Sequence, residues 1–132
     1  MKKRISVVCT GMLLAVIAVC AAQQAPATFK RTELQRADLS AAGREVVQAV
    51  VDFQPAGAAG RHNHPGEEIG YILEGTIRFE LDGQPPAMKK AGDYFFVPAG
   101  RTHNATSVGS GTAKVLATYI VEKGKPLATP VP

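Results

Sequence analysis

The sequence predicts an all-β fold, a sandwich or a barrel, within one small domain of 132 residues. The first observation is spacing, because short runs rich in β-branched and aromatic residues are separated by Gly- and Pro-containing turns at intervals of about 8 to 12 residues. The second is alternation. Between Thr76 and Asp82 every second side chain is apolar (Ile77, Phe79 and Leu81), as expected of a strand with one face in water.

Six segments are predicted to be strands, each bounded by turn residues. They are residues 45–54, 68–74, 76–81, 94–97, 103–108 and 114–121. Within two of them, residues 46–53 and 69–73 carry apolar side chains at both odd and even positions. Such strands need cover on both faces, so we expect either a homodimer interface or an N-terminal arm laid across the sheet.

The domain organisation follows from these strands. Residues 44–122 are expected to form the barrel domain. Residues 23–43 precede it as an N-terminal arm, in which residues 32–39 form either a short helix or irregular structure. Residues 123–132 have no apolar periodicity and are expected to be a C-terminal tail.

Residues 1–22 have the pattern of an export signal. Three basic residues precede an apolar run from Ile5 to Val19, and small residues follow before Gln23. The run of about 15 residues is shorter than the roughly 20 that a membrane span needs. We expect cleavage near Ala22 and export to a bacterial periplasm, with no stable membrane span afterwards. Lipidation at Cys20 and an uncleaved anchor are the alternatives.

The excess of basic residues and both cysteines also lie in residues 1–22. The formal charge is +4, but without Lys2, Lys3 and Arg4 the balance is 12 basic to 11 acidic residues. The chain therefore has no basic excess for nucleic-acid binding, which we exclude. Cys9 and Cys20 both lie in the signal, so the mature chain has neither disulfides nor thiol chemistry. A domain of this size leaves room for stabilisation by a metal or by dimerisation.

The three histidines and one glutamate carry the chemistry. His62 and His64 are two residues apart, so a strand directs both imidazoles to the same face. Glu68 begins the next apolar run, where a turn would fold its carboxylate back beside them. His103 lies 35 residues further on, at the start of another strand. Three imidazoles and one carboxylate suit a first-row divalent metal with coordination positions left open.

The residues around these four resemble the two sequence motifs of the cupin family. The first motif spans Gly57 to Gly75 and contains His62, His64 and Glu68. The second is Gly92, five residues, Pro98, one residue, Gly100, two residues and His103. Gly57 is one residue closer to His62 than the general pattern has it, and Ser107 stands where the second motif ends in Asn.

The resemblance covers residues 46–121 and implies a jelly-roll barrel and commonly a homodimer. It also implies that His62, His64, Glu68 and His103 surround one divalent transition metal. The same ligand set accepts Fe, Mn, Ni, Cu or Zn, so the sequence does not name the ion.

The expected activity is that of a dioxygenase-like enzyme acting on a small aromatic or enolic molecule. An open metal position in an apolar pocket suits this chemistry, and Glu68 is the candidate catalytic base. The expected lining is Val50, Ile72, Phe79, Phe96, Leu116 and Tyr119 or their neighbours. Tyr71 and Asn104 are expected to face away from the ligands, and Glu67 is expected to be a solvated carboxylate.

The same fold leaves other functions open. Decarboxylases, isomerases and lyases share it. A non-catalytic module that binds a small molecule or a metal is the main alternative, and a cupin whose metal only stabilises the fold is a third.

Overall fold

The computed structural model describes residues 28–132, so the expected export signal lies outside the described residues. Within this range the chain forms strands and turns without a helix, and hence without a helix that could cross a membrane. The strands are β1 (Phe29–Asp38), β2 (Arg44–Phe53), β3 (His62–Asn63), β4 (Gly66–Glu74), β5 (Thr76–Leu81), β6 (Ala87–Lys90), β7 (Tyr94–Val97), β8 (His103–Ser107), β9 (Ala113–Glu122) and β10 (Thr129–Pro130).

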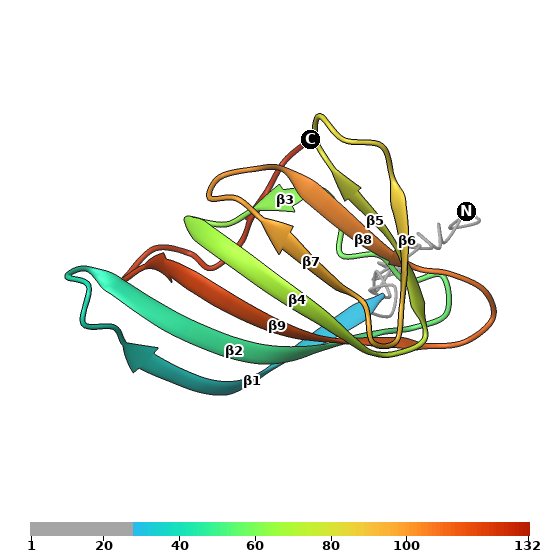
Figure 1. Cartoon of the computed structure of the whole chain (residues 1–132), viewed down its shortest axis with the longest axis horizontal. Coiled ribbons are helices and arrows are strands. Elements are labelled where there is room, and N and C mark those ends of the chain that lie inside the picture. Colours follow the sequence, from blue (N-terminus) through green and yellow to red (C-terminus); the bar gives the residue numbers. More distant parts are fainter. Residues whose placement is uncertain (1–27) are drawn as a thin grey trace, which may run out of the picture.

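The strands form two five-stranded antiparallel sheets. One sheet has the order β1-β2-β9-β4-β7, and the other has the order β10-β3-β8-β5-β6. Figure 1 shows β1, β2, β9 and β4 side by side in one layer, with β5, β6 and β8 in the other. This arrangement confirms the all-β jelly-roll fold that the sequence predicts.

The core lies between the two sheets and follows the two-residue period of the strands. In β2 and β9 every second residue is buried, and their pairing places Val47 opposite Tyr119 and Val51 opposite Val115. Cross-strand partners point to the same side of a sheet, so these side chains meet Ile77, Phe79 and other apolar residues of the second sheet. Burial of this apolar area is the main favourable term in folding.

All six predicted strands are present, with bounds that agree within two residues. The alternation between Thr76 and Asp82 is confirmed, because Ile77, Phe79 and Leu81 are buried and Arg78 is exposed. Three further short strands, β3, β6 and β10, were not predicted. β3 and β10 have two residues each, and β6 ends in two lysines and so lacks an apolar alternation.

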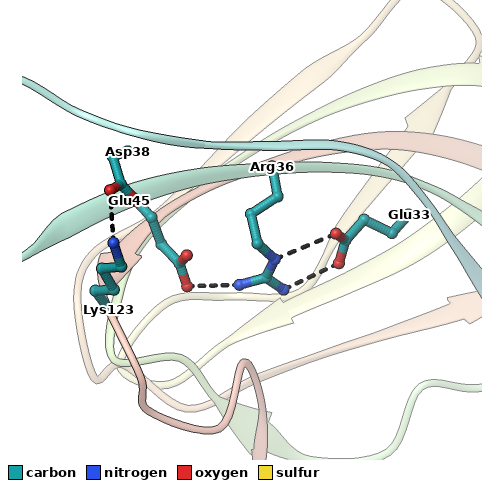
Figure 2. Close-up of polar contacts among 5 residues, drawn as sticks. All are labelled: Glu33, Arg36, Asp38, Glu45 and Lys123. Carbon is teal, nitrogen blue, oxygen red and sulfur yellow. Dashed lines mark hydrogen bonds and ion pairs between the residues drawn. The ribbon is translucent and has the colours of Figure 1, made fainter.

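The N-terminal arm is neither a helix nor irregular, because residues 29–38 form the edge strand β1. It pairs with β2 along its whole length, with a bulge between Glu33 and Gln35. Ion pairs hold its far end, where Arg36 binds both Glu33 and Glu45 (Figure 2). Nearly all of β1 is exposed, so its sequence lacks the apolar alternation that would have predicted a strand.

One face of the β1-β2-β9-β4-β7 sheet is left without cover by the described residues. The arm extends this sheet at its edge and does not lie across it. On β4 and β7 five large apolar side chains therefore point outward and are 40–72% exposed. We call these residues the outer patch: Ile69, Tyr71, Leu73, Tyr94 and Phe96.

Candidate metal centre

Three imidazoles meet beside the paired strands β3 and β8. His62 on β3 lies directly opposite His103 on β8, and His64 follows β3 where the chain leaves that sheet. Their ring centroids are 4.3 to 5.0 Å apart. One ring nitrogen of each histidine lies within 4.8 Å of the others. The structure therefore brings together the three histidines singled out by the sequence.

Glu68 joins them from the other sheet. The chain crosses between the sheets at Pro65, and β4 then begins at Gly66, so Glu68 enters from a strand and not from a turn folding back. Its Oε2 lies 3.1 Å from Nε2 of His64 and 2.9 Å from Nε2 of His103. The carboxylate is buried with 5% of its residue surface exposed.

Backbone carbonyl groups orient all three rings. Nδ1 of His62 lies 2.7 Å from the carbonyl oxygen of Gly60, Nδ1 of His64 lies 2.6 Å from that of Leu127, and Nδ1 of His103 lies 3.2 Å from that of Arg101. A carbonyl oxygen only accepts, so each Nδ1 is the protonated nitrogen. Such backbone partners are the usual outer support of metal-binding histidines.

This tautomer leaves the ring nitrogens facing Glu68 as acceptors. A neutral imidazole has one N–H, so Nε2 of His64 and Nε2 of His103 present lone pairs to the carboxylate oxygen. Three acceptors at these distances repel one another unless the rings take a second proton or a cation lies among them. Imidazole nitrogen and carboxylate oxygen are accepted by first-row divalent metals, so the four residues fit such an ion.

The pKa values favour the protonation states that metal ligands need. Burial lowers the pKa of His62 to about 4, outweighing the hydrogen bond to Gly60, which raises it. Burial by itself would raise the pKa of Glu68, but the imidazoles of His103 and His64 lower it to about 2, because a second proton on either ring would be donated from Nε2 to the ionised carboxylate. Near neutral pH, His62 is therefore neutral and Glu68 is ionised.

A cavity of about 230 Å³ opens directly onto the site. His62, Glu68 and His103 face it, whereas His64 is fully buried behind them. Its apolar wall consists of Phe29, Val51, Phe53, Ala59, Phe95, Ala105, Val115, Ala128 and Pro130. A metal held by the four residues would thus be reachable from this cavity.

The expected pocket lining left open which side of each strand faces the cavity, and the structure decides it. Tyr119 lines the cavity as expected. Val50, Phe96 and Leu116 do not, and their neighbours Val51, Phe95 and Val115 line it in their place. Ile72 and Phe79 belong to the core, where Phe79 stacks on Phe95 with centroids 4.3 Å apart. These strands carry apolar residues at both odd and even positions, so the sequence alone does not indicate which face of each strand points into the barrel.

Tyr119 is a polar group of the cavity besides the ligands. Its ring lies 4.7 Å from that of His64, and only 2% of the residue is exposed. Burial raises the pKa of Tyr119 well above its usual range, and the charge of Glu68 acts in the same direction. The phenol is therefore a neutral hydrogen-bonding group beside the site.

Other polar candidates lie elsewhere. Tyr71 and Tyr94 are on the outer patch. Asn104 points away from the ligands and donates to Glu80, as the alternation after His103 predicts. Glu67 lies on the outer side of β4 and does not line the cavity.

Two segments outside the predicted barrel also reach the cavity. Phe29 and Arg31 come from β1, and Ala128 and Pro130 come from the expected tail. Sequence reasoning missed them because both segments are mostly exposed and pack by only a few side chains, which leaves no apolar period.

Comparison with known proteins agrees with this description. A family model described as "Cupin domain" matches residues 49–119. Dimethylsulfoniopropionate lyase DddQ of Ruegeria pomeroyi is 43% identical over 56 residues, which cover 42% of this chain and 28% of that protein. The chain thus spans less than a third of the length of this relative.

Solved structures share the fold. That of DddQ from Ruegeria pomeroyi DSS-3 matches with a TM-score of 0.58 and 28% identity over 65% of this chain and 43% of that one. Oxalate oxidase in complex with the substrate analogue glycolate gives a TM-score of 0.64 with 24% identity, covering 82% of this chain and 63% of that one. An RmlC-like cupin from Shewanella frigidimarina matches with a TM-score of 0.59 and 20% identity, covering 77% of this chain and 84% of that one. The family model spans more than half of the sequence, and the chain belongs to the cupin family.

Proposed function

We propose that His62, His64, Glu68 and His103 bind one divalent transition metal, and that the protein is a metal-dependent enzyme acting on a small molecule in the adjoining cavity. The observation that carries the proposal is the convergence of two Nε2 lone pairs on the Glu68 carboxylate, with each Nδ1 held by a backbone carbonyl. The open side toward the cavity favours a catalytic centre over a purely structural one.

The reaction class that we favour is oxidation of a small aromatic or enolic substrate by a dioxygenase-like mechanism. A bound metal would supply Lewis acidity and redox capacity in this site. The chain contributes an apolar wall that orients the substrate and excludes water, including Phe53 and Phe95. Tyr119 contributes a hydroxyl group for hydrogen bonding, and Glu68 is the candidate base.

A lyase is the second candidate. It is supported by the 43% identity to DddQ, a dimethylsulfoniopropionate lyase. Because that match covers 28% of the relative, the activity cannot be transferred with it, and the reaction has to be measured on this protein. A non-catalytic module that binds a small molecule is the remaining alternative.

The test is metal analysis of the protein purified without a metal-affinity tag. We expect one Fe, Mn, Ni, Cu or Zn per chain in the wild type. His62→Ala and Glu68→Ala should each lower metal affinity more than about 100-fold, because loss of even an outer-shell partner costs about 10- to 100-fold. Glu67→Ala is the matched control, since this neighbouring carboxylate faces the other side of β4. Equal metal content in all three variants would overturn the ligand assignment.

Activity of the metal-loaded protein then separates the candidates. Oxygen uptake with small aromatic or enolic compounds supports the oxidoreductase, and cleavage of dimethylsulfoniopropionate without oxygen uptake supports the lyase. Neither activity, together with saturable ligand binding, would point to the binding module.

Two properties of the whole protein belong to the same proposal. We propose that residues 1–22 direct export to the periplasm, which a mass measurement of the mature chain beginning near Gln23 tests. We also propose a homodimer. Its support is the outer patch, which no described residue covers.

A further inference from the structure

We infer that the cavity binds a small organic carboxylate and that Arg31 is the residue that binds its carboxyl group. This inference rests on the proposed function for what happens to the bound molecule. It uses a residue that is neither a metal ligand nor part of the region that matches the cupin family, because that region begins at residue 49.

The register of β1 directs Arg31 into the site. Arg31 pairs with Val51 and Phe29 pairs with Phe53, and cross-strand partners lie on the same face of a sheet. Val51 and Phe53 line the cavity, and Arg31 lines it with them. Arg31 is itself an exposed residue, so it stands at the mouth, with the metal-binding residues further inside.

Arg31 is the arginine at this mouth whose charge is not already neutralised by a partner. Arg61 also lines the cavity, but its guanidinium binds both carboxylate oxygens of Asp82 at 3.0 and 2.9 Å. Further along β1, Arg36 is held between Glu33 and Glu45 (Figure 2). Within residues 28–132, no carboxylate forms an ion pair with Arg31.

The chemistry of the cavity then selects a carboxylate. A guanidinium is always charged and presents two parallel N–H groups that match the two oxygens of a carboxyl group. Among residues 28–132, Glu68 is the only acidic residue that lines the cavity, and a bound divalent metal would more than offset its charge.

Size and lining limit the rest of the ligand. About 230 Å³ is below the range of roughly 300–1,000 Å³ of drug-sized sites, so the ligand has few heavy atoms. Phe29, Phe53 and Phe95 offer aromatic faces for a flat or apolar body. A small aromatic or enolic acid therefore fits better than a neutral or cationic molecule.

The test compares benzoate with benzamide, which have nearly the same shape but differ in charge. Dissociation constants are measured by ligand-observed NMR on the protein as purified and again after removal of metal with a chelator. Arg31→Met removes the charge, and Arg31→Lys keeps it without the two-pronged geometry. Arg78→Met is the matched control, because Arg78 is exposed on β5 and does not line the cavity.

We expect wild-type protein and Arg78→Met to bind benzoate at least about tenfold more tightly than benzamide, with or without metal. In Arg31→Met the preference should vanish from the metal-free protein, and Arg31→Lys should keep part of it. Equal binding of the two compounds by the wild type, a preference that survives in Arg31→Met, or no saturable binding of either compound would overturn the inference.

Metal content, measured on the same samples, tests the proposed function separately. A wild-type protein without metal that still shows the Arg31-dependent preference would refute the metal enzyme and keep the carboxylate site. A metal-loaded wild-type protein without the preference for benzoate would refute the carboxylate site and keep the metal-binding proposal.

Discussion

Each histidine of the site has its protonated nitrogen assigned by a backbone carbonyl. The partners are Gly60 and Arg101, each two residues before the histidine it orients, and Leu127, which lies 63 residues after His64. Two of these contacts are therefore local properties of the sequence around His62 and His103. The third depends on the fold, because only the packing of the C-terminal segment places Leu127 beside His64.

The low pKa of His62 predicts how stability changes with pH in the metal-free protein. Burial lowers this pKa from 6.5 to about 4, so between these values the unfolded chain binds more protons than the folded chain. Stability should be fully present above pH 6.5 and should fall as the pH falls toward 4. Thermal unfolding of chelator-treated protein measures this dependence. His62→Asn should make the dependence shallower in this window, and Glu67→Gln is the control.

Glu68 makes the stability of the metal-free protein depend on pH in a second, lower pH range. The pKa of Glu68 falls from 4.5 to about 2 on folding, so its contribution to the free energy of unfolding is present above pH 4.5 and is lost as the pH falls through 2.

An unchanged pH dependence of stability between pH 6.5 and 4 in His62→Asn would contradict the burial argument for His62.

At the scale of elements, the C-terminal segment is part of the metal centre. β10 pairs with β3, where Pro130 lies opposite His62, and the amide of Val131 donates to the carbonyl of Arg61. Leu127 packs against the core and orients His64 through its carbonyl. Residues 127–131 therefore support two of the four proposed ligands.

Deletion of residues 126–132 should reduce metal affinity about 10- to 100-fold, the usual effect of losing an outer-shell partner. The barrel should still fold, because the segment adds only the two-residue strand β10 to its sheet. Deletion of Pro132 alone, which leaves Leu127 and Val131 in place, is the control. Metal titration with a competing chelator measures both. Wild-type affinity in the longer deletion would show that the Leu127 carbonyl is dispensable.

Gly66 sets the approach of β4 to β9. It pairs with Val121, and a Cβ at this position would lie 2.0 Å from the carbonyl oxygen of Ile120. Backbone atoms cannot move aside cheaply, so only glycine fits here.

Gly66→Ala should lower the free energy of unfolding by about 1–3 kcal/mol or more, because β4 has to shift away from β9. It should also weaken metal binding, since Glu68 is two residues further along β4. Gly111→Ala is the matched control, because a Cβ there meets nothing within 4 Å and should change stability by less than about 0.5 kcal/mol. Denaturant unfolding compares the two, and equal stability would argue against a rigid contact between the strands.

At the scale of the whole molecule, the outer patch predicts self-association. Its five side chains lie next to one another, since Ile69 pairs with Phe96 and Tyr71 pairs with Tyr94. Contiguous exposed apolar surface of this kind marks an interface in a soluble protein.

Light scattering should give twice the chain mass for the wild type and the chain mass for Phe96→Lys, because a charge in the interface would be buried without a partner. Met88→Lys is the control, since Met88 is 55% exposed but lies on β6 in the other sheet. A monomeric wild type, or a dimeric Phe96→Lys, would exclude the outer patch as the dimer interface.

Much of the fold and the site could be predicted from local sequence. In a strand with one face in water, apolar and polar residues alternate. The side of Thr76–Leu81 that faces the core could therefore be predicted correctly. Histidines two residues apart share a side of an extended chain, so His62 and His64 were expected together, and their rings lie 4.8 Å apart. The domain boundaries, the export signal and the identity of the metal stay predictions.

Tertiary structure alone decided the rest. The strands β2 and β7 carry apolar residues on both sides, so only the packing of the two sheets determined that Val51 and Phe95 line the cavity while Val50 and Phe96 do not. The edge strand β1 and the C-terminal segment lack an apolar period because they are held by backbone pairing and a few contacts. The sequence by itself therefore determined the fold class and the four residues that meet, whereas long-range pairing decided what surrounds them, including Arg31 and Leu127.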